Sequence, residues 1–415
     1  MMIIKTAFWA MSQTLVKLMA GFIIIKLIAK VGGPNALSSF GLYQNLVTVL
    51  LMMSGGVVFA GVTSKIARTK DDNEFTAFYL GVNSFLNSLC LFSVLVILPL
   101  CIGVVYFSVE NDSYDLIILL LISLPFILLQ TRFNFYLAIL NGLKKVNLLA
   151  RKSIYASLLT VVIACAAYLF TTDWRVFAIC MCLGPAFKYM YEYFKANNDY
   201  VLTENIEPER NLNYLLHYSF AGLVSSICLP SAQIIARDFI ANHNGLYDSG
   251  IWQGLTRFSE VYLVLISSIL SIYILPKISP AKTKAHIKDC ILPLFLLLTP
   301  VIFIGVGLVY ILKEYIIIIL FSREFLPMKE LFIYQLPGDV FKIFALILTF
   351  SLLGLGKVKT LILLELAYFC VYLSLIYFSV PLYGLKGSII AYSVSYFLYL
   401  LLAISVFFYW YKKYE

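Results

Sequence analysis

Long apolar stretches separated by short polar breaks run along the whole chain. A transmembrane helix needs about 20 predominantly apolar residues, and twelve stretches reach that length. They cover residues 6–30, 38–65, 76–107, 114–141, 147–170, 174–195, 212–241, 247–275, 288–312, 328–353, 358–380 and 384–411. The pattern therefore predicts an all-α polytopic membrane protein with twelve transmembrane helices.

Composition agrees with this pattern. Hydrophobic residues make up 61 % of the 415 residues and charged residues 13 %, against roughly 45–50 % and about 25 % in soluble domains. The outer loops are short, which argues against a membrane-embedded polymerase or ligase with acid–base residues in a large loop. We find no P-loop, no HExxH and no nucleophile elbow, so we expect no catalytic residues, no cofactor and no bound metal.

Short motifs recur about half a chain length apart. Residues 142–146 (GLKKV) recur as 354–358 (GLGKV), an offset of 212 (354 − 142). Leu124-Pro125 recurs as Leu336-Pro337 at the same offset, and residues 41–46 recur as 250–255 with an offset of 209 (250 − 41). The repeats predict two pseudo-symmetric six-helix lobes, 1–195 and 212–415. Substrate sites of such transporters tend to lie between the repeats.

Two polar segments interrupt the apolar pattern. Residues 196–211 are the most polar stretch of the chain and form the predicted cytoplasmic linker between the lobes. Residues 313–327 are too short to cross a membrane, and we expect an amphipathic segment at the outer surface there.

Lysine and arginine are distributed unevenly between the two sides of the predicted bundle. With the N-terminus inside, 19 lie in cytoplasmic segments and 7 in outer segments. The positive-inside rule then places both termini in the cytoplasm. The net charge of +9 mostly reflects this topology, so the basic balance gives no reason to expect nucleic-acid binding.

Eight charged residues lie within the predicted spans, where a charge costs roughly 2.5–3.5 kcal/mol on insertion scales and usually serves function. Two groups share a spacing of i, i+4 and i+7, which places each on one helical face. Each group offers an amide beside a potential ion pair, Arg257/Glu260 or Asp339/Lys342. The bases are Lys17, Lys26, Arg132, Arg257 and Lys342; the acids are Glu260, Asp339 and Glu365; the two amides are Gln253 and Gln335.

These charges have a structural and a functional interpretation. The pairs could simply neutralise one another between packed helices. Alternatively, a surplus of cations in a water-filled cavity favours an anionic ligand such as a phosphate. Lys17 is too deep to snorkel to water, whereas Lys26 is near a helix end. Arg132 suits either the substrate or a lipid headgroup.

Polar and aromatic neighbours extend the candidate site. Gln44 and Asn45 occupy in the first lobe the depth that the Gln253 stripe occupies in the second. Tyr43, Trp252 and Tyr262 lie beside these polar positions, where aromatic faces could stack on sugar rings. We therefore assign substrate binding to Lys17, Lys26, Gln44, Asn45, Arg132, Trp252, Gln253, Arg257 and Lys342, and ion coupling to Glu260, Asp339 and Glu365.

Several of these residues also carry a family resemblance. The segments 14–17 (TLVK), 250–255 (GIWQGL), 262–263 (YL), 273–276 (YILP) and 335–342 (QLPGDVFK) resemble Wzx-type flippases of lipid-linked oligosaccharides over nearly the whole chain. The resemblance covers Lys17, Lys26, Asp339, Lys342 and Glu365. An enterobacterial member has Asp at the position of Glu260 and a small polar residue at that of Arg257, which points to a role of Arg257 in specificity.

This resemblance implies the multidrug/oligosaccharidyl-lipid/polysaccharide exporter superfamily, with two six-helix lobes around a central cationic cavity and alternating access. The implied substrate is an undecaprenyl-pyrophosphate-linked O-antigen-type oligosaccharide repeat, moved from the cytoplasmic to the periplasmic leaflet of a bacterial inner membrane. Implied partners are membrane lipids, a coupling ion (H⁺ or Na⁺), and a polysaccharide polymerase and glycosyltransferases. The alternative is a drug/cation antiporter of the same superfamily, against which the surplus of bases argues.

Overall fold

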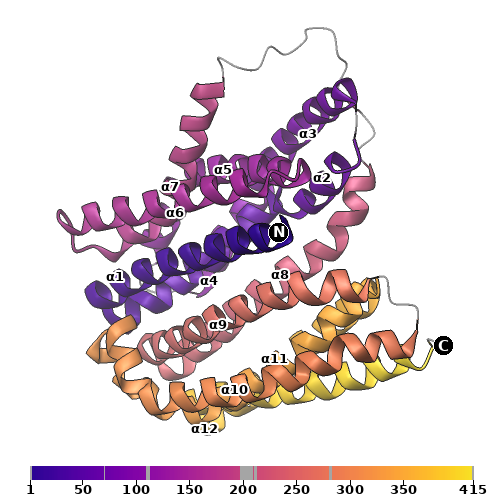
Figure 1. The fold of residues 1–415 in the computed structure, drawn as a ribbon. Helices are drawn as coiled ribbons and strands as arrows, with labels where there is room; N and C mark the ends of the chain where they lie inside the picture. The colour runs from indigo at the N-terminus through magenta and orange to yellow at the C-terminus, as the bar shows by residue number, and fades with distance from the viewer. Residues whose placement is uncertain are drawn as a thin grey trace. The chain divides into compact units, whose positions relative to one another are not determined.

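The computed structural model describes residues 2–69, 71–108, 113–196, 209, 213–279 and 283–413. Every regular element within these ranges is helical (Figure 1). The chain divides into two compact units: unit 1 contains residues 1–31 and 39–230, and unit 2 contains residues 32–38 and 231–415. The predicted linker, 196–211, lies outside the described residues except for Ala196 and Glu209. The lobe boundaries at 195 and 212 therefore stay a prediction.

The elements follow the predicted stretches closely. They are α1 (Met2–Met53), η1 (Gly56–Val58), α2 (Phe59–Ile66), α3 (Asp72–Phe92), the π-helical turn η2 (Ser93–Ile97), α4 (Leu98–Ser108), α5 (Ser113–Gly142), α6 (Val146–Tyr168), α7 (Trp174–Ala196), α8 (Asn213–Asn244), α9 (Leu246–Ile278), α10 (Lys284–Leu320), η3 (Arg323–Glu330), α11 (Phe332–Gly354) and α12 (Val358–Tyr411). In the described part of the chain, seven helices are long and apolar enough to cross a membrane, or eight if the bent pair α1 and η1–α2 counts as one span.

The two longest helices each contain a break that divides them. A straight helix of the 54 residues of α12 would be about 80 Å long, far more than the roughly 30 Å hydrocarbon core of a bilayer. Gly384 has φ 58° and ψ −141°, and the rings of Tyr368 and Tyr396, on opposite sides of it, lie 4.6 Å apart. The second half of α12 therefore folds back along the first.

Gly33, with φ 62° and ψ −160°, precedes Pro34 and interrupts α1 in a similar way. The helices match the twelve predicted stretches once α1 and α12 are divided at these glycines, the second part of α1 is joined with η1 and α2, and α3, η2 and α4 are taken as one span.

Two local predictions were wrong. Residues 313–320 do not form a separate surface segment, because α10 continues to Leu320 and only the short η3 follows it. The predicted stretch 38–65 is not one helix, because the chain bends by 55° between α1 and η1. Gly55 has φ 149°, and a Cβ on it would lie 2.5 Å from a methyl carbon of Leu86. Only glycine fits this bend.

The repeated GLKKV and GLGKV motifs form the same turn. Lys145 N donates to the Leu140 carbonyl at 2.9 Å, and Lys357 N donates to the Leu352 carbonyl at 2.9 Å. This is a Schellman closure, in which the residue after the helix end takes a left-handed conformation. That residue is Lys144 (φ 58°) in the first turn and Gly356 (φ 72°) in the second. The backbone thus supports the duplication inferred from sequence.

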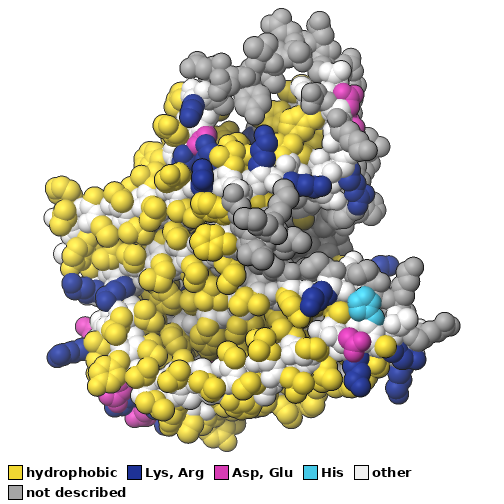
Figure 2. Space-filling model, viewed as in Figure 1, with side chains coloured by type: hydrophobic (Ala, Val, Ile, Leu, Met, Phe, Trp, Pro, Cys, Tyr) yellow, Lys and Arg dark blue, Asp and Glu magenta, His cyan; other side chains and the backbone are white. Residues whose placement is uncertain are grey.

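The surface of unit 2 fits a membrane environment. Figure 2 shows apolar side chains over most of the length of its helices and charged side chains near the helix ends. In α10, only 11 % of the most apolar window is buried, so most of its apolar surface needs a non-aqueous solvent.

Candidate functional site

A fully buried carboxylate, Asp339 on α11, is the centre of the polar interior of unit 2. Its side chain is 0 % exposed. Oδ1 accepts hydrogen bonds from Tyr392 Oη at 2.7 Å and Gln335 Nε2 at 3.4 Å. Oδ2 accepts from Ser259 Oγ at 2.9 Å and from Tyr262 Oη. We call these five residues the Asp339 network.

The donors come from three helices: Gln335 from α11, Ser259 and Tyr262 from α9, and Tyr392 from the second half of α12. A carboxylate that accepts several hydrogen bonds is held in its charged form, while burial opposes that charge. Protonation would convert one carboxylate oxygen into a donor and remove acceptor capacity. Asp339 therefore ties α9 and α12 to α11 through bonds that depend on its charge.

The predicted pair of Asp339 with Lys342 does not form in this structure. Among the described residues, Asp339 has hydroxyl and amide partners and no lysine within 4.0 Å. The i, i+3 spacing predicted contact, but hydroxyl donors on α9 and α12 take the acceptor positions instead. Lys342 remains within electrostatic range of both Asp339 and Glu260.

Lys342 instead lies against aromatic rings. Its Nζ is 4.7 Å from the ring centroid of Tyr396 and 5.9 Å from that of Tyr392. Such contacts stabilise a cation by roughly 0.5–2 kcal/mol. Tyr396 also contacts the rings of Tyr368 at 4.6 Å and Tyr392 at 4.8 Å, and Tyr372 stacks on Tyr368 at 5.7 Å.

The predicted Arg257 stripe is confirmed as one helical face. Arg257 Nη1 donates to Glu260 Oε2 at 2.7 Å. In the amide orientation that satisfies both groups, Gln253 Oε1 accepts from Arg257 Nε at 3.0 Å and Nη2 at 3.1 Å. Gln233 on α8 donates to the other Glu260 oxygen at 2.7 Å. This pair is neutralised within the bundle, as the structural interpretation of these charges expected.

The remaining predicted residues of unit 2 are placed differently. Trp252 is 2 % exposed and packs in the interior, so its ring is closed to a ligand in this conformation. Glu365 is partly buried on the first half of α12 and acts electrostatically on Tyr399.

The predicted residues of unit 1 fall into three groups. Lys17 and Lys26 are exposed on α1. Asn45 is buried, and Gln44 has a buried Oε1 without a hydrogen-bond partner among the described residues. Arg132 on α5 donates to Asn83 Oδ1 at 2.6 Å and to Asn87, both on α3.

Sequence reasoning missed several residues of this site. Ser259, Gln233 and the tyrosines at 368, 372, 392, 396 and 399 were not singled out. The i, i+4 spacing of Tyr368/Tyr372 and of Tyr392/Tyr396 was a visible signal, but 29 tyrosines in the chain made it weak. Within the described residues, no group of three His, Cys, Asp or Glu side chains could hold a metal ion.

The chain has full-length relatives among bacterial flippases. It is 26 % identical over 422 residues to the lipid III flippase of Escherichia coli K12 and to that of Shigella flexneri, covering 100 % of each chain. It is 24 % identical to a putative O-antigen transporter of Shigella flexneri, covering 95 % of each chain. No family model matches the sequence.

Solved transporters share the fold. An inward-facing multidrug resistance MATE transporter of the MOP superfamily superposes with a TM-score of 0.78 at 13 % identity, covering 96 % of this chain and 94 % of the other. An outward-facing MATE transporter gives a TM-score of 0.70 at 13 % identity, covering 99 % and 95 %. A Pyrococcus furiosus MOP transporter, described by the reverse polarity of its binding pocket, gives 0.70 at 14 % identity, covering 99 % and 95 %.

These findings confirm the family resemblance and the prediction of a transporter rather than an enzyme. They also confirm the all-α fold and a multi-pass membrane protein. The chain is a full-length homologue of bacterial lipid III flippases and of an O-antigen transporter, and it has the fold of the multidrug/oligosaccharidyl-lipid/polysaccharide exporter superfamily.

Proposed function

We propose that this protein moves an undecaprenyl-pyrophosphate-linked O-antigen-type oligosaccharide from the cytoplasmic to the periplasmic leaflet of a bacterial inner membrane. The full-length similarity to flippases of two bacteria carries the proposal. The exposed cations Lys17 and Lys26, and Lys342 beside its tyrosine rings, are suited to pyrophosphate oxygens. Gln44, with its unsatisfied acceptor, is suited to a sugar hydroxyl.

The Asp339 network supplies a coupling device for alternating access. Binding of H⁺ or Na⁺ at Asp339 would remove acceptor capacity from Ser259, Tyr262 and Tyr392. Since these donors lie on α9 and α12, neutralisation would loosen both helices from α11. Relatives of the same fold are known in inward-facing and outward-facing conformations, which is consistent with such a cycle. Glu260 and Glu365 remain candidates for a second coupling group.

We also propose that both termini lie in the cytoplasm and that the protein works with enzymes of polysaccharide synthesis. The excess of lysine and arginine in the cytoplasmic segments supports cytoplasmic termini. Glycosyltransferases would make the repeat before translocation, and a polysaccharide polymerase would consume it afterwards. Labelling of single cysteines added at each terminus, with and without permeabilisation, tests the orientation.

The decisive experiment is deletion of the gene in its source bacterium. We expect loss of surface polysaccharide and accumulation of one completed repeat on lipid, accessible only from the cytoplasmic side. Complementation with Lys342→Met should not restore export, whereas Lys329→Met, at an exposed lysine of η3, should restore it. Restoration by both variants would remove Lys342 from the mechanism. Intact polysaccharide with altered drug sensitivity would instead identify a drug/cation antiporter.

A further inference from the structure

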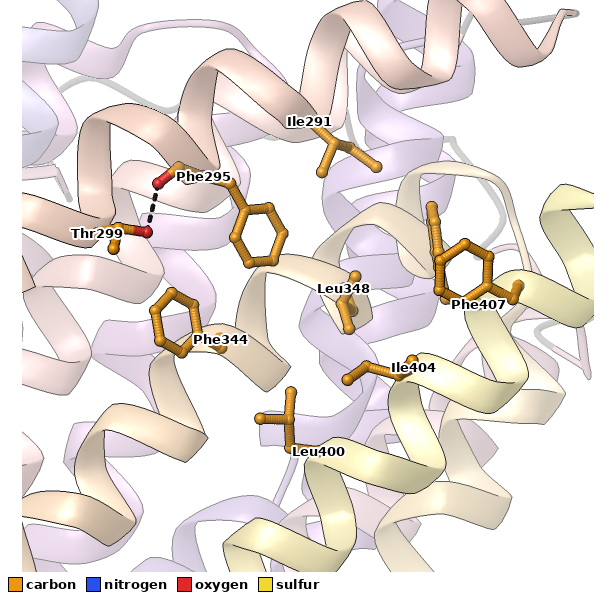
Figure 3. Close-up of a pocket in the computed structure, with 9 residues that line it drawn as sticks. Ile291, Phe295, Thr299, Phe344, Leu348, Leu400, Ile404 and Phe407 are labelled. Carbon is orange, nitrogen blue, oxygen red and sulfur yellow. Dashed lines mark hydrogen bonds between the residues drawn. The ribbon is translucent and has the colours of Figure 1, made fainter.

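An apolar cavity of about 460 Å³ lies in unit 2, and its lining on α11 begins at Phe344, further along that helix than the Asp339 network. Figure 3 shows its walls: side chains of α10 and α12 face one another across a floor of Phe344 and Leu348 from α11. The other lining residues are Ile291, Phe295, Thr299, Leu400, Ile404, Phe407 and Phe408. The one polar side chain, Thr299, donates its hydroxyl to the Phe295 carbonyl at 2.7 Å. The lining side chains of the cavity therefore have no free hydrogen-bonding group for a water molecule.

The cavity exists because α10 and α12 both pack on α11 but scarcely on each other. Phe295 and Phe344 stack with their ring centroids 5.6 Å apart and close one part of the wall. Much of α10 around the cavity is exposed, including Leu296 and Leu297. Since α10 is one of the membrane-spanning candidates, its exposed face is surrounded by lipid, and hydrocarbon is the matching occupant.

The size of the cavity indicates how much hydrocarbon it takes. An apolar cavity of about 150 Å³ admits one benzene molecule, so a volume three times larger accommodates on the order of 18 carbon atoms. This matches a single fatty acyl chain. A polyprenyl chain is several times longer and would leave most of its length outside.

One end of the cavity is cationic and aromatic. Lys288 follows the same face of α10 as the lining residues Ile291, Phe295 and Thr299, because their spacing of 3, 4 and 4 residues keeps one helical stripe. Lys288 is exposed. Across from it, Tyr411 Oη on α12 donates to the Lys284 carbonyl at 3.4 Å.

At the same end of α12, Lys357 Nζ lies 3.9 Å and Lys413 Nζ 4.8 Å from the Trp410 ring centroid. Tryptophan and tyrosine prefer the headgroup level of a bilayer. Lysines at that level attract anionic lipid.

We propose that this cavity is a binding site for an anionic glycerophospholipid. One acyl chain fills the space between α10, α11 and α12, and the phosphate lies at Lys288. The site is separate from the Asp339 network, and the proposal stands whether or not the transported substrate is a lipid-linked sugar. It assigns to the second half of the chain a resident lipid that fills the gap between two helices joined mainly through α11.

Photo-crosslinking of the full-length protein tests the proposal. The protein is reconstituted in phosphatidylcholine vesicles that contain phosphatidylglycerol with a photoactivatable acyl chain, and labelled peptides are mapped by mass spectrometry. We expect labelling on α10 and α12 at the lining residues. Leu400→Trp, which fills the cavity, should abolish it. Lys288→Ala should reduce it about fivefold, the effect of one lysine near an anionic surface.

Matched controls separate this site from general lipid contact. Leu363→Trp, at a leucine that is 67 % exposed on the first half of α12, and Lys386→Ala, at an exposed lysine beyond Gly384, should leave labelling unchanged. Equal labelling of all variants would show annular lipid only. Equal labelling by a phosphatidylcholine probe, or labelling by a polyprenyl phosphate probe in place of phosphatidylglycerol, would overturn the assignment.

Discussion

Helices α5 and α11 end in the same turn but bury different chemistry. With the offset of 212 that relates the two turns, Asp339 corresponds to Ile127, Lys342 to Gln130 and Gln335 to Ser123. Ile127 and Asp339 are both 0 % exposed. The backbone of the turn depends on local hydrogen bonds that many side chains allow, whereas a buried charge requires donors on neighbouring helices. The duplicated frame could therefore persist while the two interiors diverged.

The same contrast holds between α9 and the second half of α1. With the offset of 209, Arg257 corresponds to Thr48 and Glu260 to Leu51, while Gln253 corresponds to Gln44. The side-chain oxygen of Gln253 accepts hydrogen bonds from Arg257. The side-chain oxygen of Gln44 is buried and has no hydrogen-bond partner among the described residues. A buried unsatisfied acceptor costs roughly 1–3 kcal/mol. At this pair of positions, unit 2 thus pairs the amide of Gln253 with Arg257, and unit 1 retains at Gln44 an acceptor for water or a ligand.

Replacement of Asp339 should have the largest effect. Asp339→Ala leaves Ser259, Tyr262, Tyr392 and Gln335 without their common acceptor, so we expect a loss of roughly 3 kcal/mol or more in stability together with loss of export. Asp339→Asn keeps the shape and part of the hydrogen bonding, and should keep most of the stability while still losing export. Thermal unfolding of the purified variants and surface polysaccharide on gels measure the two effects. Normal export by Asp339→Asn would show that the charge is not needed.

Transfer of the charge to the duplicated position tests whether unit 1 can hold it. Ile127→Asp places a carboxylate at a position that holds a fully buried aliphatic side chain, and we expect destabilisation of about 3 kcal/mol, the insertion cost of an aspartate at mid-membrane. Ile127→Leu, which changes shape without charge, should cost less than about 1.5 kcal/mol. Thermal melts of both variants decide the point. If Ile127→Asp were as stable as Ile127→Leu, the two interiors would be more alike than their residues indicate.

The two turns offer a smaller test with opposite signs. Gly356→Ala places a Cβ at a left-handed residue and should destabilise the protein by about 1 kcal/mol, while Lys144→Gly removes such strain and should stabilise it by up to about 1 kcal/mol. Gly356 has open space around it, so the effect of Gly356→Ala is conformational rather than steric. Unfolding temperatures measured side by side should move in opposite directions. Movement in the same direction would contradict the equivalence of the two turns.

The smallest effect is expected at the surface pair of Lys329 and Glu314. Lys329 Nζ lies 2.9 Å from Glu314 Oε1, and both side chains are well exposed. The Glu314 carboxylate raises the pKa of the Lys329 ammonium above its ordinary value. Any stabilisation is therefore fully present below the unfolded lysine pKa of about 10.4, as long as Glu314 stays ionised above about pH 4.3, and it is lost as pH rises through the higher folded pKa of Lys329. We expect Lys329→Met to melt like the wild type between about pH 5 and pH 9. A difference that varies within that range would show that this pair titrates with another group.

Some features of this protein follow from short segments of sequence. The helices follow from apolar stretches long enough to cross a bilayer, and the Arg257 stripe follows from a spacing that any helix converts into one face. The turns at 142–146 and 354–358 are equally local. In each case the interacting groups lie within about two helical turns of one another, so their geometry needs no knowledge of the rest of the chain.

Tertiary structure decided the features that join distant helices. The i, i+3 spacing predicted a contact between Asp339 and Lys342, but the packing of α9 and α12 brought closer donors to the carboxylate. The reversal at Gly384 placed Tyr368 against Tyr396 and set the rings that Lys342 contacts. The cavity beside Leu348 arises because α10 and α12 both pack on α11 and make few contacts with each other. Sequence periodicity fixes which face a residue occupies, but the neighbour that meets this face depends on helix reversals and packing between distant parts of the chain.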